Sequence, residues 1–218
     1  MHKVTARDFG LRCQSNFATP KPYAEDAVRG FVSTAIREFA SYGVGANSFV
    51  NNEGDRLFNY GISLSLFNGN AAFLLGRDGL LRSLAGGQNE RDAELIRQLL
   101  TRAHRCLPEL EKVTHRMTAF CHAEFTEGDE LGKLFQELVV VKAGVKAVAL
   151  SVLGDDANDL LLAPDDRLRL DVAPSELKEG RLFMAWRFSA RGAIPEDYWA
   201  ALAPRFKATA GSLGIEFV

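Results

Sequence analysis

Alternating apolar and polar residues predict a β-hairpin in the first half of the chain. Within Leu57 to Phe67, Phe58 and every second residue after it are apolar, and asparagine, glycine or serine fill the positions between them. This period of two is typical of a strand with one buried face. Asn68-Gly69 follows, and Ala71 to Leu75 is a second strand-like run. Because Asn-Gly readily adopts the positive φ angles of a tight turn, we expect the two runs to pair as an antiparallel hairpin.

Apolar residues three and four positions apart predict helices elsewhere in the chain. The stretches with this spacing are Tyr23 to Tyr42, Asn89 to Cys106, Leu131 to Leu138 and a C-terminal segment that Pro195 opens and Gly214 closes. Asn89 is a favourable N-cap, and the acidic residues that follow it lie in the first turn, where the helix dipole favours negative charge. Pro204 should kink or split the last helix, because proline cannot donate the helical hydrogen bond.

Further strand-like runs follow along the chain. They are Val113 to Phe125, Val145 to Leu153, Leu160 to Leu162, Leu168 to Val172, Arg181 to Phe188 and Ile215 to Val218. Short connections between such runs favour antiparallel pairing. We therefore expect an α+β fold in which helices pack mainly on one face of antiparallel sheet.

The two halves of the chain share a coarse order of strands, one helix and a last strand, so a weak pseudo-repeat is one interpretation. Under that interpretation, residues 22–126 and 127–218 would be subdomains. No linker rich in proline, glycine or serine separates the halves, and their residues show negligible similarity. A single α+β domain over residues 1–218 is the interpretation that we prefer.

The composition narrows the class of protein and its compartment. Of the 218 residues, 47% are apolar and 25% are charged, and 26 Lys and Arg stand against 28 Asp and Glu. A nucleic-acid partner would therefore need a local basic patch.

The first residues lack the apolar run of a signal peptide, no stretch is long enough to span a membrane, and the three cysteines are an odd number at wide spacings. We expect a cytoplasmic protein with reduced thiols that acts without a membrane.

Motifs for cofactors and metals are incomplete. Gly43 to Ser48 begins like a dinucleotide fingerprint but lacks its third glycine and follows a predicted helix. Asp155 to Asn158 lacks the acidic spacing of a calcium loop, and neither CxxC nor a helical His pair occurs. Gly86-Gly87 could offer backbone N–H groups to an anion, although an ordinary loop and helix cap explains the pair better. We expect no cofactor and no metal.

One face of the Val113 to Phe125 strand gathers reactive side chains. Arg116, His122 and Glu124 share this face, because residues two apart on a strand point to the same side. If the strand lay beside the predicted hairpin, Ser63 and Ser65 would join them, and the group could perform acid and base chemistry. A polar sheet face that only meets water is the simpler explanation.

Three classes of function remain. We prefer a non-catalytic binding or assembly protein that acts on a protein partner or by self-association, because catalytic motifs are missing while the sheet and amphipathic helices offer surfaces. An enzyme of unrecognised type is the first alternative. Its weak catalytic candidates are His122, Glu124 and Arg116, and its weak ligand-binding candidates are Ser63, Ser65, Gly86 and Gly87. The other alternative is a nucleic-acid binder through the Arg181 to Arg191 strand, where arginines flank Phe183.

Overall fold

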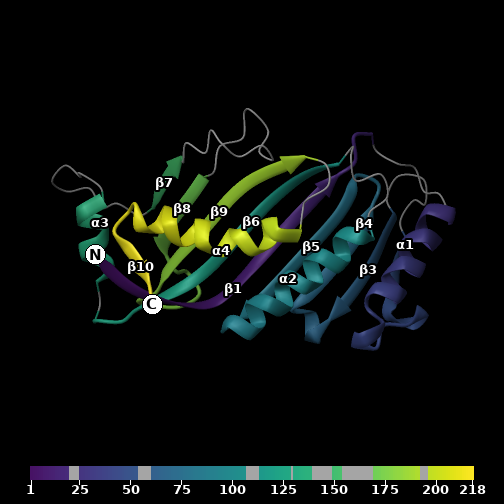
Figure 1. The fold of residues 1–218 in the computed structure, drawn as a ribbon, viewed down its shortest axis with the longest axis horizontal. Coiled ribbons are helices and arrows are strands. Elements are labelled where there is room, and N and C mark those ends of the chain that lie inside the picture. The colour runs from purple at the N-terminus through teal and green to yellow at the C-terminus, as the bar shows by residue number, and fades with distance from the viewer. Residues whose placement is uncertain are drawn as a thin grey trace.

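The structure is a computed structural model that describes residues 1–19, 25–53, 60–106, 113–128, 130–138, 149–153, 169–191 and 196–218. In these ranges the chain forms ten strands and four α-helices (Figure 1). The strands are β1 (His2–Asn16), β2 (Phe49–Glu53), β3 (Tyr60–Leu66), β4 (Ala71–Gly76), β5 (Gly79–Gly87), β6 (Thr114–Phe125), β7 (Leu150–Leu153), β8 (Arg169–Pro174), β9 (Leu182–Arg191) and β10 (Ile215–Phe217). The helices are α1 (Glu25–Glu38), α2 (Glu90–Arg105), α3 (Leu131–Leu138) and α4 (Glu196–Gly211). The predicted α+β class is confirmed.

All ten strands belong to one open sheet, and its two longest strands, β1 and β6, lie side by side at the centre. The order across the sheet is β2-β3-β4-β5-β1-β6-β9-β8-β7, and every neighbouring pair in this order is antiparallel. β10 pairs in parallel with the first residues of β1, so the two ends of the chain lie together (Figure 1). Outward from β1 run β5, β4 and β3, and outward from β6 run β9, β8 and β7. The two halves of the chain therefore contribute strands in mirrored order.

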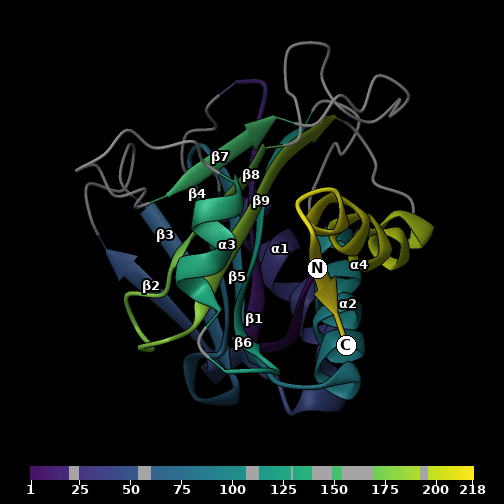
Figure 2. The same ribbon diagram turned by 90° about the vertical axis from the view of Figure 1, so that its left-hand side faces the viewer.

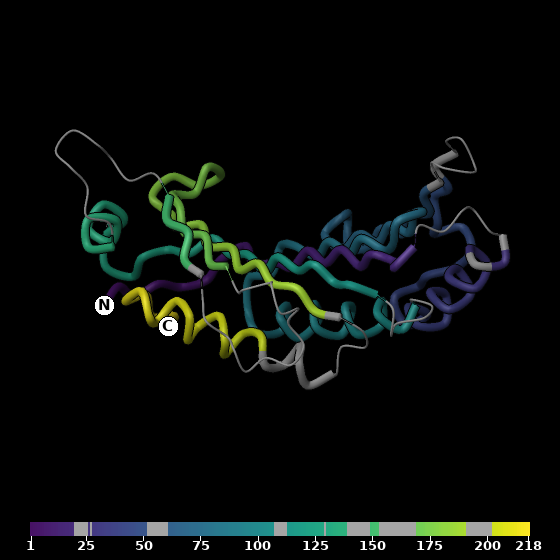
Figure 3. Tube along the Cα trace, turned by 90° about the horizontal axis from the view of Figure 1, so that it is seen from above, coloured from purple at the N-terminus to yellow at the C-terminus, as the bar shows by residue number. Residues whose placement is uncertain are grey.

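Three helices cover one face of the sheet. α1, α2 and α4 lie on the same side, whereas α3 lies at the end of the sheet beside the N-terminus of β1 (Figures 2 and 3). Alternate strand residues are buried beneath the helices, among them Leu64, Phe73, Leu84, Leu170 and Met184. Residues at the positions between them point to the opposite side, which we call the uncovered face. The expected packing of helices mainly on one face is confirmed.

The helices form where their spacing and caps predict them. The backbone N–H of Asp92 donates to Oδ1 of Asn89 over 3.1 Å and caps α2, whose residues Leu99, Leu100 and Ala103 are buried against the sheet. Pro204 lies inside α4 but does not divide it, so a split of this helix is not observed.

The predicted hairpin is confirmed as β3 and β4. Leu66 pairs with Ala71 at the closed end of the hairpin, and a short 3₁₀ turn connects the strands. Phe67, Asn68 and Gly69 all have positive φ, which is the backbone geometry that Asn-Gly was expected to supply. Residues 57–59 of the predicted first strand lie outside the described residues.

The other predicted elements are confirmed where the structure describes them, as α1, α3, β6 to β10 and α4. Residues 145–148, 154–168 and Pro195 lie outside the described residues, and with them the run Leu160 to Leu162 and the Asp155 to Asn158 segment. Three described strands, β1, β2 and β5, were not predicted.

A β-bulge interrupts the alternation of buried and exposed residues along the central strand β1, so a period of two does not run through this strand. Its register with β6 shifts between Arg7 and Gly10, and Asp8 within this segment has a φ of 44°. Val4 before the bulge and Leu11 after it both point into the core, although their positions differ by an odd number. An inserted residue has this effect on strand periodicity.

Candidate functional site

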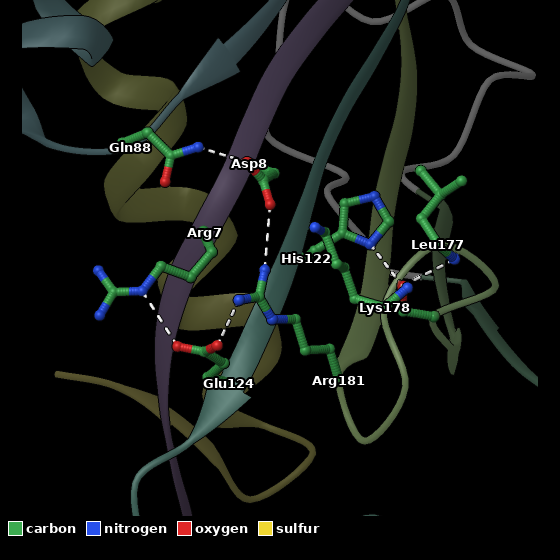
Figure 4. A network of polar contacts seen from close by, with 9 residues as sticks. Arg7, Asp8, Gln88, His122, Glu124, Leu177, Lys178 and Arg181 are labelled. Atoms are coloured by element: carbon green, nitrogen blue, oxygen red, sulfur yellow. Dashed lines mark hydrogen bonds and ion pairs between the residues drawn. The ribbon is translucent and has the colours of Figure 1, made fainter.

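The uncovered face of β6 holds His122 in a shielded position. The side chain is only 6% exposed, and its ring centroid lies 5.1 Å from that of Phe183 on the neighbouring strand β9. Its Nδ1 lies 2.9 Å from Oγ of Ser175, which also accepts the backbone N–H of Lys178 over 3.0 Å (Figure 4). The turn between β8 and β9 and the ring of Phe183 thus shield the imidazole. The expectation that this residue simply faces water is wrong.

The shielding of His122 determines its protonation. Burial lowers the pKa of His122, and the positive charges of Arg181 and Lys178 lower it further, while the negative charge of Asp8 opposes the shift. A histidine with a lowered pKa is neutral at pH 7. A neutral ring can accept a hydrogen bond from the Ser175 hydroxyl at Nδ1 or donate one to its oxygen, depending on the tautomer.

Glu124 lies two residues further along β6, and two arginines neutralise it. Arg7 donates from Nε to Oε2 over 3.2 Å, and Arg181 donates to Oε1 (Figure 4). These hydrogen bonds lower the pKa of Glu124 below its ordinary value. A carboxylate that two guanidinium groups hold in its charged form is a weak base, so Glu124 serves better to fix the two arginines in place.

Asp8 connects this group to the bulge of β1. Its backbone has the left-handed conformation that residues other than glycine seldom adopt, and its carboxylate accepts hydrogen bonds from Arg181, over 3.0 Å, and from Gln88. Arg181 therefore bridges Asp8 and Glu124, and so links β1, β6 and the start of β9 (Figure 4). Backbone strain of this kind concentrates at functional sites.

The structure separates the other candidates from His122. Arg116 shares its face but lies six residues along β6, which is about 20 Å at strand spacing. β4, β5 and β1 lie between β3 and β6, so Ser63 and Ser65 are about 19 Å from β6 across the sheet and still farther from His122. The pairing of β6 beside the hairpin, on which their joint chemistry depended, does not occur.

Gly86 and Gly87 end strand β5 and do not form a loop before α2. Gly87 pairs with Phe9 of β1, and a Cβ at position 87 would collide with the Phe9 ring, so this glycine permits close packing. The next backbone N–H, that of Gln88, already donates to the carboxylate of Asp92 over 2.8 Å. One backbone N–H group at the start of α2 is therefore already hydrogen-bonded within the protein and is not free to bind an anion.

A row of arginines crosses the uncovered face, and sequence reasoning identified only part of it. Arg12 pairs with Thr118, Thr118 with Arg187, and Arg187 with Arg169, which places three arginines in one line across β1, β6, β9 and β8. Arg116 lies two positions from this line on β6. We call Arg12, Arg116, Arg169 and Arg187 the arginine row, and all four are exposed. No single segment of the sequence reveals it, because each member comes from a different strand.

One carboxylate lies within the arginine row. Oδ1 of Asp171 lies 2.7 Å from Nε of Arg169, and Oδ2 lies 3.0 Å from a terminal nitrogen of Arg187. Among the described residues, no carboxylate lies within ion-pair distance of Arg12 or Arg116. These two guanidinium groups are therefore available to bind an anionic group from outside.

Three further findings concern metals, membranes and relatives. The described residues contain no group of three His, Cys, Asp or Glu side chains placed to hold a metal ion. None of the helices in the described ranges combines the length and the apolar character that crossing a membrane requires. The sequence matches no protein-family model, and no curated protein matches it either.

Proposed function

We propose that this chain is a non-catalytic binding protein whose uncovered sheet face holds an acidic segment of a protein partner. The observation that supports this function is the arginine row, because four exposed guanidinium groups share a face that the described helices leave open. Guanidinium binds carboxylate through paired, planar hydrogen bonds, and Arg12 and Arg116 have their donors available for such bonds.

Charge on the same face favours a protein over a nucleic acid. Asp8, Glu124 and Asp171 lie among the arginines of this face, and Asp171 forms ion pairs with both Arg169 and Arg187. A continuous row of phosphates would meet these carboxylates and be repelled, whereas separate carboxylates of a folded or extended segment can avoid them. Arg181 and Arg187 of the alternative nucleic-acid surface do share the uncovered face with Phe183, but Glu124 and Asp171 pair with them.

Fluorescence anisotropy with two labelled probes tests the proposal. The probes are a deca-glutamate peptide and a 20-nucleotide oligouridylate, and the variants are Arg12→Ala/Arg116→Ala and a charge-matched control, Arg91→Ala/Lys207→Ala, on exposed helix positions. We expect the peptide to bind the wild type, to bind the first variant at least about tenfold more weakly, a difference of about 1.4 kcal/mol, and to be unaffected by the control. Tighter binding of the oligouridylate would replace the protein partner with nucleic acid, and no binding of either probe would reject the proposal.

A second candidate function, an enzyme centred on His122, is favoured by one observation. Nδ1 of His122 lies 2.9 Å from the Ser175 hydroxyl, beside the strained backbone of Asp8. A neutral imidazole beside a serine can act as a general base. Against this function, Ser175 Oγ already accepts two backbone N–H groups of its own turn, which is the geometry of a structural serine.

Complementation separates this candidate from a structural role for His122. Because the ring is buried and hydrogen-bonded, His122→Ala should cost about 1–3 kcal/mol of stability. Activity in cells lacking the gene is then compared at matched protein levels for His122→Ala, Ser175→Ala and Glu124→Gln. Failure of the first two variants to complement, with a folded protein, supports the enzyme, and full complementation by both excludes it.

The cytoplasm remains our proposal for the compartment. Cys13, Cys106 and Cys121 are free thiols in the structure, which supports a reducing environment. Fractionation that recovered the protein from an oxidising compartment would contradict this proposal.

A further inference from the structure

Arg82 occupies a position where an arginine is seldom found. It lies in the middle of β5, pairs with Cys13 of β1, and points toward the helix-covered face. The residue is 0% exposed, so its guanidinium lies wholly within the core, between Leu80 and Leu84 on its own strand. Arginine remains protonated in proteins, so a full positive charge lies in this core.

The side chains around Arg82 cannot balance this charge. Its terminal nitrogen Nη2 lies 2.8 Å from Sγ of Cys13 and 3.4 Å from Nδ1 of His115, and it donates to Oγ of Ser15. Each of these partners is neutral or cationic. Among the described residues, no carboxylate lies within ion-pair distance of Arg82, and its Nε and Nη1 atoms have no hydrogen-bond partner.

Cys13 does not act as an internal counter-ion, and His104, whose pKa the charge of Arg82 affects, is uncharged. Burial raises the pKa of Cys13 although Arg82 acts in the opposite direction, so the thiol keeps its proton at pH 7. Burial and the charge of Arg82 lower the pKa of His104 to about 3, so this ring is neutral. A buried cation without a counter-ion is strongly unfavourable, because the protein interior replaces little of its hydration.

We propose that Arg82 forms a buried binding site for a small monovalent inorganic anion of the size of chloride, held by the Nε and Nη1 donors of its guanidinium. Three observations support the site: complete burial, unpartnered donors, and neutral partners on the remaining nitrogen. The Nε and Nη1 atoms have almost no surface accessible to water, so the surrounding side chains must move apart to admit even a monatomic anion. The anion would join β1, β5 and β6 at the centre of the sheet.

Thermal unfolding of the full chain tests this site. Sodium chloride replaces sodium gluconate from 0 to about 300 mM at constant ionic strength. An anion that binds only the folded state should raise the Tm of the wild type by at least about 3 °C over this range. Arg82→Met, which keeps the length of the side chain without the charge, should remove this response, whereas Arg91→Met, at an exposed position of α2, should retain it.

A second measurement covers the case in which Arg82→Met does not fold. Chloride-35 NMR line broadening reports binding to the wild-type protein directly, and bromide should compete with chloride for the same site. Broadening that bromide reverses supports the site. A wild-type Tm that is identical in chloride and gluconate, an unchanged response in Arg82→Met, or the absence of line broadening would each overturn the proposal.

Discussion

Nε2 of His2 lies 2.8 Å from Oε2 of Glu137, which joins the first residues of β1 to helix α3. The other ring nitrogen, Nδ1, lies 2.8 Å from a carboxylate oxygen of Glu130, one residue before the same helix. A ring that contacts a carboxylate through each nitrogen is best satisfied as the doubly protonated cation. These contacts raise the pKa of His2, although burial acts in the opposite direction.

The attachment of α3 should therefore weaken in alkaline solution. The folded-state pKa of His2 is raised above 6.5, so the stability that the cation contributes is complete below pH 6.5 and disappears as the pH rises through the folded-state value. We expect hydrogen-exchange protection of residues 131–138, corrected for the intrinsic rate, to fall between pH 6 and pH 9, while protection of α2 stays constant. Glu137→Gln should remove this pH dependence and Glu127→Gln, an exposed control, should keep it.

Gly10 should be the least replaceable glycine among those described in β1 and the segment before β2. A Cβ at position 10 would collide with the carbonyl oxygen of Leu84 and lie 2.6 Å from Cζ of Phe120, whereas a Cβ at Gly45 would meet nothing within 4 Å. We expect Gly10→Ala to cost more than about 3 kcal/mol or to prevent folding, and Gly45→Ala to change stability by less than about 0.5 kcal/mol. Urea denaturation measures both. Equal effects of the two substitutions would show that β1 and β5 do not approach this closely.

Acid should destabilise the protein through His104. Burial lowers its folded-state pKa to about 3, and the charges of Arg82 and His115 act in the same direction. Between pH 6.5 and about 3, the unfolded chain therefore binds a proton that the folded chain does not. Stability should fall by about 1.4 kcal/mol for each pH unit within this window. His104→Gln should flatten the pH dependence of the free energy of unfolding from pH 6.5 to 4.5, even if it lowers stability at pH 7. A slope identical to that of the wild type would assign the acid sensitivity to other groups.

The native thiols should be inert. Burial raises the pKa of Cys106 and of Cys121 to about 12, and Cys13 is also buried. We expect a disulfide reagent such as DTNB at pH 8 to react at least about a hundredfold more slowly with the folded protein than with the protein unfolded in guanidinium. Ser65→Cys, at an exposed position, should add one thiol that reacts at once.

Chelators and reducing agents should leave the Tm unchanged, and a shift of several degrees with either would reveal a metal or a disulfide.

The sequence predicted elements well where a single period runs through them. The helix over residues 89–106 and the strand over 113–125 emerge almost at their observed limits, because each has one buried face of apolar residues. β5 was not predicted, because Arg82 occupies a buried position between two leucines and makes the buried face of the strand look polar. Local patterns describe one face of one element and cannot anticipate a buried charge.

The candidate site shows a similar limit. The shared face of His122 and Glu124 follows from their spacing and was predicted correctly. Their partners Arg7, Asp8 and Arg181 come from β1 and from the start of β9, and strand order decides which of these meet. Strand order depends on contacts over more than a hundred residues, and such contacts leave no periodic signal in the chain.

The position of β1 has a consequence for how the chain is made. The ribosome produces β1 before the strands that pair with it, β5, β6 and β10, which follow at increasing distances along the chain. Contacts between segments so far apart in the sequence form slowly, so the hydrogen-bonding edges of β1 should stay unsatisfied until these strands have been made. We therefore expect the nascent chain to depend on holding factors until β6 has emerged, and the protein to fold on the slow timescale of non-local sheets.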